Sequence, residues 1–133
     1  MKPGLAVGDT AEIQAVVSQD MFARFEGQLV HPAYSTVSMV YHMEWAARQL
    51  ILPYLETDEE GVGGAVSLKH LGMAAEGARL IVTATVTRLT ARRVDADIEV
   101  RDGHTIIGTG EVTQFILEKS RIQEKLQKNV STK

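Results

Sequence analysis

The sequence predicts an α+β domain in which one curved antiparallel β-sheet wraps around one long central α-helix. Three observations lead to this fold class. Residues 37–52 are compatible with a helix whose apolar residues occupy most of its circumference, and such a helix is usually buried on several sides. Much of the remaining chain alternates apolar with polar residues, which is the pattern of half-buried strands. The strands after the helix are joined mostly by short turns, so neighbouring strands run antiparallel.

Composition limits the class of protein. The 133 residues make about one domain at roughly 150 residues per domain. The formal net charge of −3 argues against a nucleic-acid binder, and the lack of cysteine excludes disulfides and thiol nucleophiles. No apolar run approaches the roughly 20 residues that span a bilayer, and the start lacks the apolar core of a signal peptide. We therefore expect a cytoplasmic single domain over 1–133, with no membrane or nucleic-acid partner.

The first elements lead up to the helix. A strand is predicted over 9–17, where the apolar members of the alternation are Ala11, Ile13, Ala15 and Val17. Residues 18–34 have no clean period and are expected to form a loop or short helix. Ser35 or Thr36 can cap the helix, because a hydroxyl accepts hydrogen bonds from the free amides of the first turn. Pro53 marks the helix end.

The second half of the chain is read as strands. They are predicted over 64–71, 79–90, 94–100 and 104–117. Asp102-Gly103 predicts a hairpin between the last two, while Gly108 and Gly110 predict a bulge or a close backbone approach. Residues 119–133 are expected to form a charged C-terminal helix and tail, frayed over 129–133. One sheet with one helix leaves an open edge and a bare face, so a homodimer is expected.

Among the four histidines, His70 is the strongest functional candidate, because it ends a short strand and a rigid sheet would place its ring. His31 is more simply an exposed loop residue, His42 a core or interface residue, and His104 a solvated residue beside a turn. No two histidines have the spacing of a zinc motif, so no metal site is predicted.

Glu44, Thr36 and Gly63 each allow two interpretations. Glu44 is a charged residue in the most apolar helix, either exposed and paired with Arg48 or buried and oriented by a partner. Thr36 is either a helix cap or a neighbour of free amides that stabilise an oxyanion. Gly63 either opens a strand or lets a ligand approach the backbone closely.

Several stretches resemble one known family. The run STVSMVYHMEWAA at 35–47, followed by PYLE at 53–56, is similar to the helix of the fluoroacetyl-CoA thioesterase-like family. Residues 4–8, 63–70, 108–111 and 117–119 fit the same family, so the resemblance covers nearly the whole chain. It implies the hotdog fold, hydrolysis of a small acyl-CoA thioester, and no cofactor.

The resemblance also implies site residues. The catalytic set of the family matches Thr36, Glu44 and His70, and a glycine amide that holds the thioester oxygen matches Gly63. Tyr34, Val37 and Met39 are predicted to contact the substrate. Two departures weaken a transfer of fluoroacetyl specificity: the segment before the helix is shorter than in the specialist enzyme, and Val112 replaces an arginine of its last strand.

Geometry predicts where the site lies. Eight residues of regular helix separate Thr36 from Glu44 by about 12 Å of rise, so we expect a site completed at the homodimer interface. Whether Thr36 or Glu44 attacks the thioester, or a water molecule is activated, stays open. Two other functions also stay open: a hotdog hydratase or dehydratase acting on acyl thioesters, and a non-catalytic acyl-CoA or small-ligand binding module.

Overall fold

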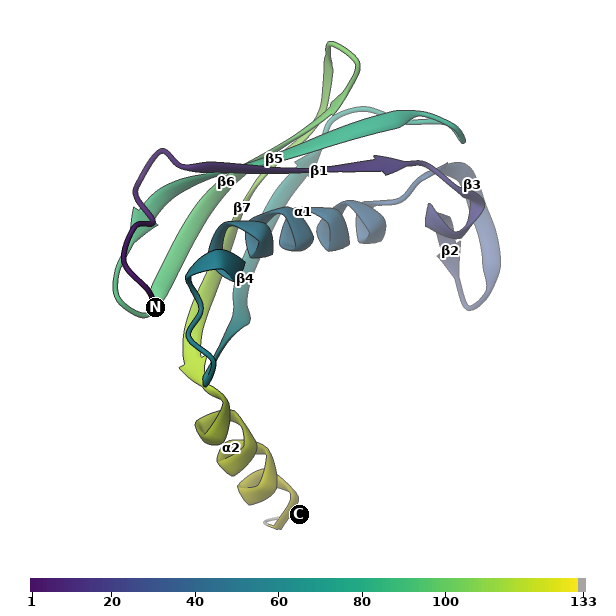
Figure 1. The fold of residues 1–133 in the computed structure, drawn as a ribbon. Coiled ribbons are helices and arrows are strands. Elements are labelled where there is room, and N and C mark those ends of the chain that lie inside the picture. Colours follow the sequence, from purple (N-terminus) through teal and green to yellow (C-terminus); the bar gives the residue numbers. More distant parts are fainter. Residues whose placement is uncertain (132–133) are drawn as a thin grey trace.

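The computed structural model describes residues 1–131 and shows an α+β arrangement of two sheets and two α-helices (Figure 1). The larger sheet is antiparallel and has five strands in the order β1-β5-β6-β7-β4, while β2 and β3 form a separate two-stranded sheet. The elements are β1 (Thr10–Val16), η1 (Gln19–Met21), β2 (Phe22–Phe25), β3 (Gln28–Tyr34), α1 (Thr36–Ile51), η2 (Leu52–Tyr54), β4 (Glu59–His70), β5 (Arg79–Leu89), β6 (Arg93–Asp102), β7 (Thr105–Glu118) and α2 (Lys119–Ser131).

Helix α1 begins and ends as its sequence requires. The Ser35 hydroxyl accepts a hydrogen bond from the Ser38 amide at 3.0 Å and caps the first turn. The helix ends at Ile51, and Pro53 lies in the 3-10 turn that follows. Helix α1 contacts all five strands of the larger sheet. One apolar stripe stays exposed in the single chain, made of Val37 (73%), Tyr41 (64%) and Trp45 (41%).

The core lies between α1 and the larger sheet. Alternate residues of β5 and β6 point toward α1 and are buried: Val82, Ala84, Val86, Ala96, Ile98 and Val100. The close approach predicted at Gly108 and Gly110 is confirmed. A Cβ at Gly108 would lie 2.5 Å from Met39 Sδ, and one at Gly110 would lie 2.5 Å from the Ser67 carbonyl oxygen. Both glycines therefore let β7 pass closely under α1 and beside β4.

The hairpin predicted at Asp102-Gly103 is confirmed with a shifted loop. Asp102 pairs with Thr105, so the two loop residues are Gly103 and His104. Gly103 has a φ of +61°, which glycine adopts without steric cost.

The prediction for residues 18–34 is wrong. Instead of a loop or short helix, β2 and β3 form a β-hairpin after the 3-10 turn η1. Its two loop residues, Glu26 and Gly27, have φ values of +51° and +77°, as tight hairpin turns require. Non-glycine residues seldom adopt a positive φ. A glutamate at position 26 therefore did not indicate a tight turn.

Strand β4 and the C-terminal tail also differ from the predictions. Strand β4 begins at Glu59 rather than at residue 64, because Glu59 and Glu60 pair with Glu118 and Leu117 of β7. The frayed tail predicted over 129–133 is helical over 129–131, and 132–133 lie outside the described residues. Strand β4 is an edge of the sheet, paired within residues 1–131 with β7 alone. In that part of the chain, no helix is long and apolar enough to cross a membrane.

Replacing Gly110 with alanine tests the close approach of β7 to β4. The new methyl group would lie 2.5 Å from the Ser67 carbonyl oxygen and 3.0 Å from Met43 Sδ. The backbone carbonyl cannot yield as a side chain does, so we expect a loss of about 1–3 kcal/mol in the free energy of unfolding. Urea unfolding measures it. Thr109→Ala, on the opposite side of the same strand, is the control, and an equally small loss in both variants would contradict the packing.

Candidate functional site

Thr36 and His70 meet where α1 begins and β4 ends. Thr36 is the first residue of α1, and His70 is the last residue of β4. The Thr36 Oγ1 atom lies 2.9 Å from His70 Nδ1, within hydrogen-bond distance. Thr36 is exposed and His70 is half-buried. Two of the three predicted catalytic residues, 34 positions apart in the sequence, are thus in direct contact.

Glu44 lies beside Gly63 of β4. A Cβ at Gly63 would be 3.0 Å from Glu44 Oε1, so the missing side chain lets the carboxylate approach the strand backbone. A small hollow of about 130 Å³ is lined here by Glu44, Arg48, Gly61, Gly63, Val112 and Gln114. Glu44 is exposed in the single chain, so it is not the buried carboxylate of one sequence interpretation. Arg48 pairs instead with Glu60 at 3.0 Å.

The four residues form two separate half-sites in the chain. Thr36 and Glu44 belong to the same regular helix, and eight residues of helix correspond to about 12 Å of rise. The Thr36–His70 half-site therefore lies at the start of α1, and the Glu44–Gly63 half-site lies two turns further along. Among the hydrogen bonds and ion pairs of residues 1–131, none joins one half-site to the other.

A buried tyrosine–histidine pair adjoins the Thr36–His70 half-site. Tyr34 is 2% exposed and His42 is 3% exposed. The Tyr34 hydroxyl lies 2.6 Å from His42 Nδ1, and the two rings stack at 5.6 Å and 13°. Burial lowers the pKa of His42 and raises the pKa of Tyr34. The hydrogen bond therefore joins a neutral imidazole and an un-ionised tyrosine hydroxyl.

The sequence placed these two residues differently. Tyr34, predicted to contact the substrate, is buried beside His42 and also lines the hollow at the Thr36–His70 half-site, so its contact with the substrate stays a prediction. The expectation that His42 is a core or interface residue is confirmed by its burial, but its bond to Tyr34 was missed. The two residues lie in a strand and a helix, and nothing in the sequence pattern places them side by side.

An open hollow of about 460 Å³ gives access to the Thr36–His70 half-site. Its lining comes from the β2–β3 hairpin, the start of α1 and the segment after β4: Ala23, His31, Ala33, Tyr34, Ser35, Thr36, His70, Leu71, Gly72 and Met73. His31 is exposed there, as expected. Val37 is 73% exposed on α1. Met39, predicted to contact the substrate, is fully buried against Gly108 and belongs to the core.

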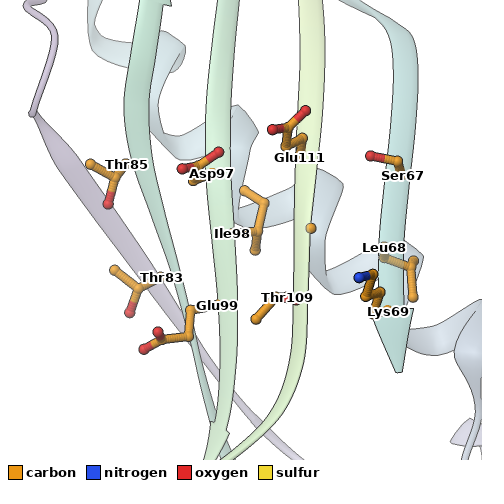
Figure 2. Close-up of a pocket in the computed structure, with 11 residues that line it drawn as sticks. Ser67, Leu68, Lys69, Thr83, Thr85, Asp97, Ile98, Glu99, Thr109 and Glu111 are labelled. Carbon is orange, nitrogen blue, oxygen red and sulfur yellow. The ribbon is translucent and has the colours of Figure 1, made fainter. Parts of the chain in front are cut away.

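A larger hollow of about 770 Å³ lies on the other face of the sheet. Figure 2 shows its polar lining along four strands, including Lys69, Thr83, Asp97, Glu99 and Glu111. It contains none of the predicted site residues. Within residues 1–131, no group of three or more metal-ligating His, Asp or Glu side chains is close enough to hold a metal ion.

Comparison with known proteins identifies the family of the chain. Residues 17–120 match the sequence profile of the fluoroacetyl-CoA-specific thioesterases. The chain belongs to this family. The fluoroacetyl-CoA thioesterase of Streptantibioticus cattleyicolor, a curated relative, is 27% identical over an alignment of 132 residues that covers 95% of this chain and 95% of that protein. All three predicted catalytic positions, and Gly63, lie within the part of the chain that matches the family.

Solved structures confirm the fold class. A Thermus thermophilus protein of the thioesterase superfamily has a TM-score of 0.92 and 37% identity, with full coverage of both chains. A hot-dog-like protein from Thermanaerovibrio acidaminovorans has a TM-score of 0.85 and 20% identity over 92% of this chain and 91% of that one. The second likeness concerns the fold alone. The family and the α+β hotdog class predicted from the sequence are therefore confirmed.

The burial of His42 makes stability depend on pH. Burial lowers the pKa of folded His42 below the ordinary value of 6.5, so acid protonates the unfolded chain first. The stability that comes from neutral His42 is fully present above about pH 6.5 and is lost as the pH falls toward the lowered pKa. We expect the free energy of unfolding of the wild type to fall from about pH 7 to about pH 5 more steeply than that of Tyr34→Phe/His42→Leu.

Urea unfolding at a series of pH values measures this difference. The matched control is His104→Ala, which removes an exposed histidine beside a turn and should keep the wild-type pH dependence. Equal pH dependence in the wild type and the double variant would contradict a neutral, hydrogen-bonded His42.

Proposed function

We propose that this protein hydrolyses small acyl-CoA thioesters to a carboxylic acid and CoA, using Thr36, Glu44 and His70. The observation that carries the proposal is the 2.9 Å contact between Thr36 Oγ1 and His70 Nδ1, in a chain that belongs to a thioesterase family. A hydroxyl in contact with an imidazole is an arrangement that moves a proton to or from an attacking oxygen. Family membership favours hydrolysis over the hydratase and binding-module alternatives.

The proposed chemistry assigns a task to each group. Water, directly or after attack by a side chain, forms the new carbon–oxygen bond, and the carbon–sulfur bond breaks. His70 accepts a proton from the attacking oxygen and returns it to the departing thiolate. Amides at the start of α1 or the Gly63 amide stabilise the oxyanion. Glu44 orients His70, activates water or attacks the carbonyl. Thr36 either attacks the carbonyl or positions the water.

We infer that the two half-sites meet in a homodimer. Strand β4 is an unpaired sheet edge of 12 residues, and such edges are seldom left open. The exposed stripe of Val37, Tyr41 and Trp45 on α1 is a second surface that a partner would cover. A dimer that buries the β4 edge and this stripe would also place α1 of one subunit between its own five-stranded sheet and the partner subunit. Helix α1 would then be covered on both sides.

The positions of the residues suit a two-fold axis. Gly63 and His70 lie on either side of Val66 in β4, and Thr36 and Glu44 lie on either side of Val40 in α1. In an antiparallel pairing of β4 with its copy, residues before the axis face residues after it. Glu44 and Gly63 of one subunit would then approach Thr36 and His70 of the other.

The Glu44–Gly63 half-site supports a small acyl group. Its hollow, of about 130 Å³, is smaller than the hollow at the other half-site. The larger, open hollow of about 460 Å³ at Thr36 and His70 is suited to the thiol-bearing arm of CoA. A cytoplasmic location, expected from the sequence, is consistent with a CoA substrate and stays a prediction.

Glu44→Gln and His70→Ala test the catalytic assignment. Each variant loses a group that handles a proton, so we expect kcat/KM with acetyl-CoA to fall by about 10²–10⁴-fold. Release of CoA thiol measures the rate, and circular dichroism confirms the fold. The controls are Glu111→Gln and His104→Ala, which make the same chemical changes at exposed positions away from the half-sites. Near-normal turnover in both folded test variants would contradict the assignment.

The range of substrates follows from the small size of the Glu44–Gly63 hollow and from Val112 in its lining. Val112 offers no charge or hydrogen-bond donor there, and the arginine of the specialist enzyme is missing. We expect kcat/KM to be highest for acetyl-CoA, propionyl-CoA and similar short chains. Fluoroacetyl-CoA should be favoured over acetyl-CoA by less than about 100-fold, or ~2.7 kcal/mol in transition-state binding. A larger preference would show that another part of the site recognises fluorine.

A further inference from the structure

The Tyr34–His42 pair is a buried polar contact to which the proposed chemistry assigns no task. We infer that Tyr34, held by His42, is a positioning residue that fixes the orientation of the His70 ring. This inference rests on the proposed function, because it gives the pair a role in the same reaction. It gives Tyr34 a role different from the substrate contact that the sequence predicted.

The first step of the argument is that Tyr34 is fixed at both ends. Its backbone amide donates to the Ala74 carbonyl oxygen at 2.9 Å. At the other end, its hydroxyl lies 2.6 Å from His42 Nδ1. The stacked rings, at 13° to one another, restrict rotation about the side-chain bonds. The Tyr34 side chain is therefore held in one conformation.

The second step is that the Tyr34 ring packs against His70. The Tyr34 and His70 rings lie 6.2 Å apart and are inclined at 68°, which is the favoured edge-to-face arrangement of aromatic rings. Tyr34 is also only two residues before Thr36 along the chain. One rigid residue thus packs on the histidine of the half-site and leads directly into its threonine.

The third step is that His70 has little else to orient it. Its Nδ1 atom contacts Thr36 Oγ1. Its Nε2 atom is buried and has no hydrogen-bond partner among residues 1–131. A ring held by a single hydrogen bond depends on packing for its orientation, and the edge-to-face contact with Tyr34 supplies such packing. Misplacing a catalytic group by about 1 Å can cost about 10²-fold in rate.

The test compares two replacements of Tyr34. Tyr34→Leu removes the ring, and we expect kcat with acetyl-CoA to fall by about 10–100-fold while KM changes by less than about threefold. Tyr34→Phe keeps the ring and loses only the hydroxyl, so it should retain more activity than Tyr34→Leu. Tyr54→Leu and Tyr54→Phe are matched controls at a tyrosine remote from the half-sites, and both should keep the wild-type kcat.

A second measurement does not depend on activity. The ¹⁵N chemical shifts of the His70 ring, identified by their absence from His70→Ala, report which nitrogen carries hydrogen. In the wild type we expect one tautomer, fixed by the contact with Thr36. In Tyr34→Leu both shifts should move toward the average of the two tautomers, and in Tyr34→Phe they should move less.

The outcomes separate the inference from the proposed function. A raised KM with unchanged kcat in Tyr34→Leu would show that Tyr34 contacts the substrate, and would overturn the inference. Unchanged His70 shifts in folded Tyr34→Leu would overturn it as well. If the wild type hydrolyses no acyl-CoA but the shifts move as expected, the proposed function fails while the positioning of His70 by Tyr34 stands.

Discussion

The regular hydrogen bonding of α1 is the constraint on which the proposed site depends. It places Thr36 and Glu44 on one straight helix, eight residues and about 12 Å apart along its axis. Rotation of the two side chains does not close that distance. The helix cannot bend to bring them together, because its inner face is packed: Met39, Met43, Ala46 and Ala47 are fully buried against the sheet. The packing that stabilises the domain therefore also keeps the two halves of its chemistry apart.

Strand β4 complements this helix because it carries the second member of each half-site. Gly63 and His70 lie at different points along the strand, as Glu44 and Thr36 lie at different points along α1. Absent side chains make this arrangement possible: Gly63 leaves room for the Glu44 carboxylate, and Gly110 lets β7 approach β4. The same strand is an edge of the sheet within residues 1–131, so pairing the β4 edges of two subunits would also join the two half-sites.

The sequence predicted the elements whose pattern is strictly local. Helix α1, the hairpin near Gly103 and the glycine contacts of β7 all followed from periodicity or from the special backbone of glycine. The sequence did not predict the β2–β3 hairpin, because Glu26 adopts a positive φ that is unusual for glutamate. The Tyr34–His42 bond and the burial of Met39 were missed for a different reason. They depend on which elements pack together, and no pattern within one element contains that information.

The most direct test of the account uses dimers built from two defective subunits. Glu44→Gln and His70→Ala subunits carry different tags, and mixed dimers are isolated by both. If each site joins Glu44 of one subunit to His70 of the other, every mixed dimer has one intact site and about half of the wild-type kcat. The control pairs Thr36→Ala with His70→Ala, which damages both sites and should stay inactive. An inactive Glu44→Gln/His70→Ala mixed dimer would contradict the shared site.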